Sequence, residues 1–260
     1  MNTTVNYFHE SKRSGEPIVM VTAYDFTMAA LAEAAGIGAL LVGDSLGMVV
    51  QGKASTLSVT LDEIIYHTGM VVRGAPGSFV LADMPFMSYQ VSVEAALEAC
   101  GQVMKEALAQ GVKLEGGEVI CPQIKALVGI GIPVMGHIGL QPQSMHLYGG
   151  FGKRGKTQKE RELLLRSARL VEEAGAFALV LENISHALAE EITAAVRIPT
   201  IGIGAGPACS GQIQVFHDLL GLQPDYQPRH SKRYAAIGES IITALNSYAA
   251  DVRQGQFLSK

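Results

Sequence analysis

Short apolar runs recur along the whole chain and alternate with stretches whose apolar residues have a helical spacing. The runs are apolar on both faces, which is typical of strands that lie between helices and a packed interior. About eight such candidate strands occur, at residues 18–22, 39–42, 79–82, 111–114, 134–138, 177–181, 200–203 and 213–216. Alternation of this kind requires parallel strands with crossovers, and about eight units in roughly 250 residues are what a (β/α)8 barrel needs. The sequence therefore predicts an α/β protein with a (β/α)8 TIM-barrel fold.

Helix-start signals support this alternation. Thr60 and Glu63 have the spacing of a capping box, and Ser92 can cap the helix that follows it. A further helix is expected over residues 159–174, with Gly175 as its C-terminal cap.

No linker, repeat or low-complexity tract divides the chain, so we expect a single barrel domain over residues 1–260. The segment from about residue 231 to 260 has the pattern of a helical C-terminal tail, which could cover a barrel end or dock on another subunit. A doubly wound open sheet is the alternative fold. Its common dinucleotide fingerprint is missing from the first strand-helix turn, residues 22–27, which weakens that alternative.

Composition limits the classes of partner. The chain has 20 Lys and Arg against 24 Asp and Glu, a formal net charge of -4, so it offers no broad basic field to a nucleic acid. No apolar run reaches the roughly 18 residues of a membrane span, and residues 1–15 are too polar for a secretory signal. Cys100, Cys121 and Cys209 have the spacing of neither a disulfide framework nor a zinc site, which predicts free thiols. We therefore expect a cytoplasmic protein without nucleic-acid or membrane partners.

Polar side chains stand at the ends of successive candidate strands. They are Asp44 with Ser45, Asp83, Glu115, His137 and Glu182. In a parallel barrel these strand ends open on one face, where barrel enzymes keep their chemistry, so the side chains are predicted to converge at one mouth. Any single acid among them has an alternative role as the N-cap of the following helix.

Lys113 lies two residues before Glu115 and therefore faces the same side of its strand. A buried cluster of carboxylates needs compensating positive charge, which a divalent cation supplies. An oxygen-only set of Asp44, Asp83 and Glu115 favours Mg2+ or Mn2+ over Zn2+. The sequence therefore predicts a site for Mg2+ or Mn2+ built from these carboxylates.

A cation held in this way leaves coordination positions for a small 2-oxo acid. It would stabilise the negative charge that develops on the keto oxygen when the adjacent carbon loses a proton. Glu182 is the available carboxylate outside the metal set, so it is the candidate base. The residues alone thus indicate a metal-dependent barrel enzyme of enolate or carbon-carbon bond chemistry.

Two glycine-rich segments resemble phosphate-binding loops. Residues 150–157 match the P-loop pattern G-x-x-x-x-G-K-[ST], but residues 141–149 are too polar for the strand that a P-loop follows. We interpret residues 150–157 as a mobile basic loop beside the mouth. For residues 202–206, phosphate binding and close backbone packing remain equally open.

Several strings at these same positions resemble the ketopantoate hydroxymethyltransferase family, and the resemblance spans nearly the whole chain. They lie at residues 22–25, 42–47, 83–86, 88–89, 112–117, 136–140, 174–177, 181–182 and 198–206. Several such strings in order are far more specific than any one of them.

The resemblance implies a Mg2+-dependent barrel enzyme that transfers a hydroxymethyl group from 5,10-methylenetetrahydrofolate to 3-methyl-2-oxobutanoate. The product would be 2-dehydropantoate, on the route to pantothenate and coenzyme A. Residue by residue, it implies metal ligation by Asp44, Asp83 and Glu115, proton abstraction by Glu182, and substrate contacts from Asp44, Ser45, Asp83, Lys113 and His137. It also implies a large homo-oligomer, because family members form decamers.

The chain departs from the family pattern at residues 152–154, 183–186 and at Ser210. These departures concern loop closure, folate contacts and oligomer packing rather than the reaction. Two other functions remain alternatives: a Mg2+-dependent lyase or mutase of the phosphoenolpyruvate-type barrels, and a homologue kept only for binding or scaffolding. The intact set of candidate site residues argues against the second alternative.

Overall fold

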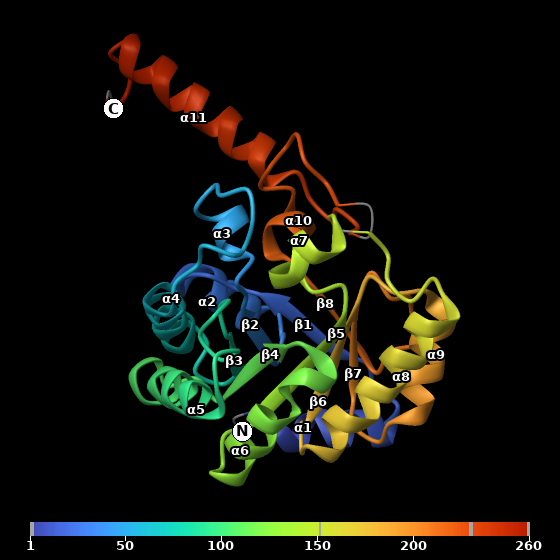
Figure 1. Cartoon of the computed structure of the whole chain (residues 1–260). Helices are drawn as coiled ribbons and strands as arrows, with labels where there is room; N and C mark the ends of the chain where they lie inside the picture. Colours follow the sequence, from blue (N-terminus) through green and yellow to red (C-terminus); the bar gives the residue numbers. More distant parts are fainter. Residues whose placement is uncertain (1–2, 151, 229–230, 259–260) are drawn as a thin grey trace. The chain divides into compact units, whose positions relative to one another are not determined.

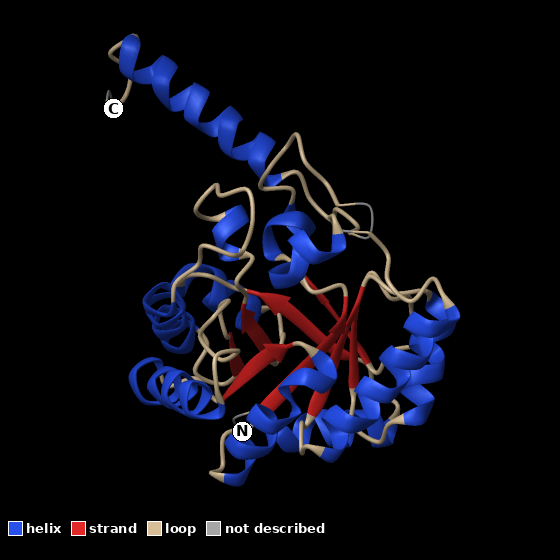
Figure 2. Ribbon diagram, in the orientation of Figure 1, coloured by secondary structure: helices blue, strands red, loops and turns tan. Residues whose placement is uncertain are grey.

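A closed barrel of eight parallel strands, in the order β1 to β8, lies at the centre of this computed structural model. The structure describes residues 3–150, 152–228 and 231–258. Figure 2 shows the strands enclosed by helices. The strands are β1 (Ile18–Thr22), β2 (Ala39–Val42), β3 (Phe79–Asp83), β4 (Gly111–Glu115), β5 (Val134–Gly139), β6 (Ala178–Glu182), β7 (Thr200–Ile203) and β8 (Gly211–Gln214). The predicted (β/α)8 barrel is confirmed, and the open sheet is wrong because the strands close into a ring.

Helices connect the strands (Figure 1). The α-helices are α1 (Val5–Ser14), α2 (Phe26–Ala34), α3 (Leu46–Val49), α4 (Leu61–Gly74), α5 (Val93–Gln102), α6 (Cys121–Gly129), α7 (Met145–Tyr148), α8 (Gln158–Glu173), α9 (His186–Ala195), α10 (Phe216–Leu220) and α11 (Ile237–Arg253). Shorter helical turns are the π-helical η1 (Val103–Ala107) and the 3-10 helices η2 (Gly117–Ile120) and η3 (Pro142–Ser144).

The chain divides into two compact units, residues 1–213 and residues 214–260. The first unit contains β1 to β7 and β8 up to Ile213, and the second contains α10 and α11. The expected helix in the tail is confirmed as α11. One domain over residues 1–260 stays a prediction. In the described parts of the chain, no helix is both long and apolar enough to cross a membrane.

Side-chain caps begin the helices where the sequence predicts them. The Thr60 hydroxyl accepts from the Glu63 N–H at 3.2 Å, and the Glu63 carboxylate accepts from the Thr60 N–H at 2.8 Å. The Ser92 hydroxyl caps α5 through the Ala95 N–H. Such caps satisfy backbone donors that a helix N-terminus leaves unpaired. Helix α8 begins and ends one residue before the predicted 159 and 174. Its C-cap is therefore Ala174, and Gly175, with a φ of +99°, follows that cap.

The last strand lies two residues earlier than expected, at Gly211–Gln214 instead of 213–216. Phe216 begins α10 and is not part of a strand. Pairing with β7 runs through Gly211, which faces Ile201. A Cβ atom on Gly211 would overlap the Ile18 carbonyl oxygen, so a glycine is needed where β8 closes against β1. The apolar residues after Ile213 resembled a strand, but they belong to the start of the next helix.

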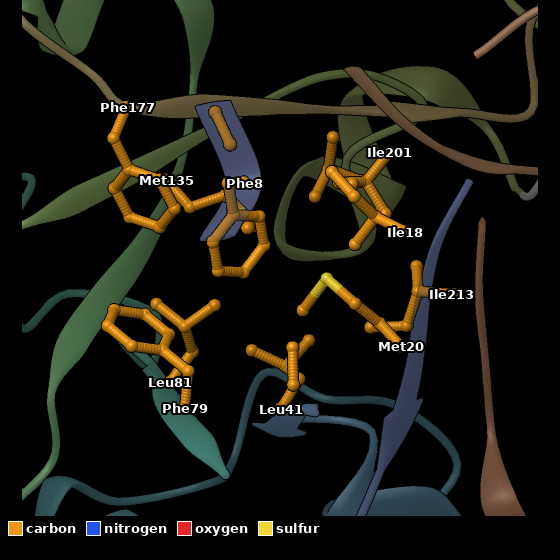
Figure 3. Packing of buried hydrophobic residues seen from close by; sticks show 13 residues of the cluster. Phe8, Ile18, Met20, Leu41, Phe79, Leu81, Met135, Phe177, Ile201 and Ile213 are labelled. Atoms are coloured by element: carbon orange, nitrogen blue, oxygen red, sulfur yellow. The ribbon is translucent and has the colours of Figure 1, made fainter. Parts of the chain in front are cut away.

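Helix α1 supplies an aromatic plug for the amino-terminal end of the barrel. The Phe8 ring lies edge-on to Phe79, at a centroid distance of 5.5 Å, and to Phe177, at 5.1 Å. Both partners stand at or just before the first residue of their strands. Figure 3 shows Phe8 among these rings and the inward side chains Leu81 and Met135. Apolar packing therefore fills this end of the barrel and leaves the opposite end for polar side chains.

Candidate active site

Polar side chains from the carboxyl ends of β3 to β6 meet at one mouth of the barrel. Strand register places Asp83 beside Lys113 and Glu115 beside His137, and Glu182 is the last residue of β6. Residues two apart on a strand share a face, so Lys113 and Glu115 both point into the barrel. All of these side chains are buried except that of Glu182, which is 20% exposed. The predicted convergence of the strand ends is confirmed.

Lys113 and Asp83 form a buried ion pair, with 2.5 Å between Nζ and Oδ1. The second carboxylate oxygen of Asp83 accepts from the Asp44 N–H at 3.3 Å. Asp44 follows β2 and is itself buried. Together, Asp44, Asp83 and Lys113 link the ends of three consecutive strands, β2, β3 and β4, at the mouth. Such a pair is sensitive to the loss of either partner, because the remaining charge would be buried alone.

His137 stands between two carboxylates. Its Nδ1 lies 3.5 Å from Glu115 Oε2, and its Nε2 lies 3.3 Å from Glu182 Oε2. Burial, followed by the nearby Lys113 ammonium, lowers the pKa of His137. The imidazole is therefore neutral at pH 7 and can donate from one nitrogen only. This arrangement places His137 between the buried Glu115 carboxylate and the partly exposed Glu182 carboxylate.

Ser45 lies at the edge of the site and follows Asp44 directly. Its hydroxyl is 2.8 Å from the Tyr24 hydroxyl. The Tyr24 carbonyl in turn is 2.6 Å from His67 Nδ1. Ser45 is half-buried, so its hydroxyl is held near the mouth without being enclosed.

Sequence reasoning missed two buried residues of this site, Gln143 and Tyr89. The Gln143 side-chain amide donates to Asp44 Oδ2 at 3.0 Å, and its backbone N–H donates to Glu115 Oε1 at 2.9 Å. The Tyr89 hydroxyl lies 2.8 Å from the Glu115 carbonyl oxygen and accepts from the Glu115 N–H at 3.1 Å. Tyr89 lies in the loop after β3, and Gln143 lies in the short 3-10 helix η3 after β5. Gln143 has no sequence signal beyond being a polar residue after a candidate strand, whereas Tyr89 stands in one of the strings that resemble the family.

Burial at this mouth disfavours the charged form of the carboxyl groups. Burial raises the pKa of Asp83 to about 7, although Lys113 acts in the opposite direction. Burial also raises the pKa of Glu115 well above its usual value. For Lys113, burial lowers the pKa, but Asp83, Asp44 and Glu115 together outweigh it and hold the pKa above its ordinary value. One ammonium among several carboxylates leaves negative charge uncompensated, so the pocket favours a further cation.

The donors at this mouth are carboxylate oxygens, the ligands that Mg2+ prefers. Among the residues that the structure describes, no three His, Cys, Asp or Glu side chains are arranged to hold a metal ion. Mg2+ is often held by only one or two carboxylates, however, with water and substrate completing its shell. The Asp44 backbone N–H contacts the Asp83 carboxylate, and the buried Glu115 Oε2 has no hydrogen-bond partner among the described residues. These oxygens suit Mg2+ chemically. Joint ligation by Asp44, Asp83 and Glu115 stays a prediction.

The acids of the site are not helix caps. Ser45 precedes α3, Ser92 caps α5, and Ser185 caps α9. None of Asp44, Asp83, Glu115 and Glu182 is the N-cap of a described helix, and the alternative role is therefore wrong for each of them. Their carboxylates remain available for chemistry.

The two glycine-rich segments lie outside this cluster of contacts. No strand precedes residues 150–157, because residues 142–148 form η3 and α7. The Thr157 hydroxyl caps α8 through the Glu160 N–H at 3.2 Å, as in an ordinary helix start. Phe151 lies outside the described residues. In residues 202–206, a Cβ atom on Gly206 would come within 2.5 Å of the His186 ring, which favours close packing. The three cysteines are free thiols, as predicted.

Gly139 places the backbone that carries Glu182, and its replacement gives a first prediction. It has a φ of +100°, and a Cβ atom there would overlap the Glu182 carbonyl oxygen. Gly139→Ala is expected to lower activity and to destabilise the fold by more than the roughly 1–3 kcal/mol of backbone strain alone. Turnover and urea unfolding measure the two effects.

Gly131→Ala is the matched control, because Gly131 has a φ of +91° but nothing within 4 Å of its added Cβ atom. It carries the strain without the overlap. Equal losses of activity in the two variants would show that Gly139 does not position Glu182.

Comparison with known proteins shows the family of the chain. A family model described as ketopantoate hydroxymethyltransferase matches residues 2–260. A 3-methyl-2-oxobutanoate hydroxymethyltransferase of Moorella thermoacetica is 51% identical over 254 residues, which cover 98% of this chain and 94% of the relative. An enzyme of the same name from Clostridium botulinum (strain Alaska E43 / Type E3) is 49% identical over 257 residues, covering 99% of this chain and 94% of the relative.

Solved structures show the same fold at low identity. A 2,3-dimethylmalate lyase of the PEP mutase/isocitrate lyase superfamily has a TM-score of 0.64 and 19% identity, covering 99% of this chain and 91% of its own. A phosphonopyruvate hydrolase has a TM-score of 0.66 and 14% identity, covering 99% of this chain and 89% of its own. These likenesses concern the fold alone. The whole-chain family match and the relatives at about half identity show that this protein is a transferase enzyme belonging to the ketopantoate hydroxymethyltransferase family.

Proposed function

We propose that this enzyme transfers a hydroxymethyl group from 5,10-methylenetetrahydrofolate to 3-methyl-2-oxobutanoate, giving 2-dehydropantoate for pantothenate synthesis. The observation that carries the proposal is the partly exposed Glu182 carboxylate beside a buried pocket of acids and one lysine, in a chain of this family. Family membership favours hydroxymethyl transfer over a lyase or mutase reaction of phosphoenolpyruvate-type barrels. The cytoplasm stays the predicted compartment.

In this proposal Asp44, Asp83 and Glu115 hold Mg2+. The ion would stabilise the negative charge that develops on the keto oxygen of the substrate. The Lys113 ammonium, anchored by Asp83, adds a fixed positive charge at the same place. Ser45 lies at the edge of this pocket, where its hydroxyl can donate to the substrate carboxylate.

Glu182 takes the proton from C3 of the substrate, which leaves an enolate. Its carboxylate is the most solvent-exposed of the acids in the cluster, and one of its oxygens lies 3.3 Å from His137 Nε2. A base must lie within hydrogen-bond reach of the proton that it removes. Glu182 stands at a strand end at the mouth, so it can reach a substrate that binds next to the buried acids. The neutral imidazole of His137 orients Glu182 without neutralising it.

The carbon-carbon bond then forms between C3 of the enolate and the methylene carbon of the folate. That carbon is bound to two folate nitrogens, and both carbon-nitrogen bonds break. Water supplies the hydroxyl group, and the two nitrogens take up the proton removed from C3 and the remaining proton of the water. The products are 2-dehydropantoate and tetrahydrofolate, so atoms balance for one methylenetetrahydrofolate, one oxo acid and one water.

The test is exchange of the C3 proton of 3-methyl-2-oxobutanoate in deuterium oxide, followed by NMR. The protein with Mg2+ is expected to exchange the proton without any folate, and chelation of the metal is expected to stop it. Product formation should require methylenetetrahydrofolate. A fully active enzyme that exchanges no proton, or that needs no divalent cation, would contradict the proposal.

We also propose that the enzyme works as a homo-oligomer. Supporting this, one face of α11 exposes large apolar side chains, among them Ile241, Leu245, Tyr248 and Val252, each 46–59% exposed. Such a stripe at helical spacing is typical of a surface that associates with another protein.

Charges placed on this stripe are expected to weaken the association. The double variant Ile241→Glu and Leu245→Glu should have a smaller mass in light scattering than the wild type at the same concentration. The control is Thr243→Glu, because Thr243 lies on the opposite side of α11 from the apolar stripe. This variant should leave the mass unchanged. An unchanged mass in the double variant would show that α11 does not join subunits.

A further inference from the structure

Gln143 is a buried residue with a hydrogen-bond partner for every polar atom of its side chain. Its Nε2 donates to Asp44 Oδ2 at 3.0 Å and to the Met84 carbonyl oxygen at 2.9 Å. Its Oε1 accepts from Gln90 Nε2 at 2.9 Å and lies 3.0 Å from the Tyr89 hydroxyl. A buried amide whose donors and acceptor are all used is held in one position.

The direction of this amide is fixed by backbone groups. The Met87 N–H donates to Gln90 Oε1 at 2.7 Å, so the other end of Gln90 must be its NH2 group. That group donates to Gln143 Oε1, which turns the NH2 group of Gln143 toward Asp44. The Met84 carbonyl, which can only accept, requires the same direction. The donation to Asp44 therefore does not depend on an arbitrary choice of amide orientation.

The same residue also holds Glu115. The backbone N–H of Gln143 donates to Glu115 Oε1, whereas Glu115 Oε2 has no hydrogen-bond partner in the described chain. One residue thus binds one oxygen of each of two proposed ligands. The other carboxylate oxygen of Glu115 is not held by Gln143 and lies 3.5 Å from His137 Nδ1.

We propose that Gln143 is a positioning residue for the divalent cation: it holds the Asp44 and Glu115 carboxylates in the orientation in which they bind Mg2+. This inference rests on the proposed metal site. Carboxylates that ligate a metal are themselves oriented by hydrogen bonds, and loss of such a partner costs about 10–100-fold in metal affinity or activity. Gln143 touches neither the substrate nor the base in this scheme and acts through its two neighbours.

The test replaces Gln143 in two ways. Gln143→Met keeps the length of the side chain and removes the donor to Asp44, and Gln143→Asn keeps the amide but is one methylene shorter. Gln141→Met is the matched control, because Gln141 lies two residues earlier in the same loop and its Oε1 accepts from the Tyr148 hydroxyl. Circular dichroism and thermal melting first establish which variants are folded.

Mg2+ binding is then measured by calorimetry without substrate, and deuterium exchange is measured as a function of Mg2+ concentration. Both Gln143 variants are expected to bind Mg2+ about 10–100-fold more weakly. The Mg2+ concentration for half-maximal exchange should rise in parallel, while the rate at saturating Mg2+ recovers to within a few-fold of the wild type. A merely structural role would reduce the amount of active protein without changing the Mg2+ constants.

The outcomes separate this inference from the proposed function. A wild type that binds Mg2+ and exchanges the proton, with folded Gln143 variants within twofold of the Gln141 control in Mg2+ affinity, would overturn only the role of Gln143. A wild type that shows neither binding nor exchange would contradict the metal site itself, and the inference with it. If Gln143→Met does not fold, the Gln143→Asn affinity decides.

Discussion

Glu182→Gln is expected to lose C3 proton exchange and turnover by at least 100-fold while still binding 3-methyl-2-oxobutanoate. A positioned general base contributes about 10²–10⁴-fold to a rate, and the amide has the shape of the carboxylate without its basicity. Substrate affinity should stay within a few-fold, because Lys113 and the buried acids remain in place. Exchange by NMR and substrate binding by calorimetry measure the two properties on the same protein.

Glu191→Gln is the control for this change. Glu191 lies on α9, where it pairs with Arg161 at 2.7 Å on the surface, so its loss should leave exchange unaltered. If Glu182→Gln exchanged the proton at the wild-type rate, another group would be the base.

Lys113→Met is expected to have the largest effect on the fold. It removes the partner of the buried Asp83 carboxylate and leaves that charge unpaired. Breaking a buried pair in this way costs about 3–5 kcal/mol in the free energy of unfolding, and turnover should also fall. Urea unfolding at a fixed protein concentration measures the loss, and Lys125→Met, an exposed lysine on α6, is the control.

A second variant separates folding from activity. Replacing both partners, as Lys113→Met with Asp83→Leu, removes both buried charges and is expected to regain much of the lost stability. Turnover should remain low, because both residues belong to the proposed site. Recovery of turnover in the double variant would show that the pair has only a structural role.

Strand ends and strand periodicity explain how much of the barrel could be predicted. The runs at 18–22 and 39–42 coincide with β1 and β2, because an apolar run between polar loops is a strong strand signal, and all residues of these two strands except Val19 are buried. The period of two placed Lys113 and Glu115 on one face, and the parallel topology placed their strand end beside that of Asp83. These properties are local or follow from topology, so one sequence is sufficient to infer them.

The loop residues of the site could not be predicted in the same way. Gln143 reaches Asp44 across 99 positions of sequence, and Tyr89 reaches Glu115 across 26. The path of each loop depends on how it packs on the finished barrel, which periodicity does not encode. The predicted bounds of β8 were wrong for a related reason. The close approach of Gly211 to Ile18 decides where strand pairing begins, whereas the apolar residues after Ile213 had suggested a strand two residues later.

The aromatic plug formed by Phe8, Phe79 and Phe177 separates two tasks within one barrel. It contains no titratable group, and it lies at the end of the strands opposite to the acids. Substitutions that improve its packing can raise heat tolerance without altering the electric field around the ligand. Directed evolution of a more heat-stable enzyme can therefore begin at the aromatic plug. Libraries aimed at new oxo acids can be confined to the residues at the carboxyl ends of the strands.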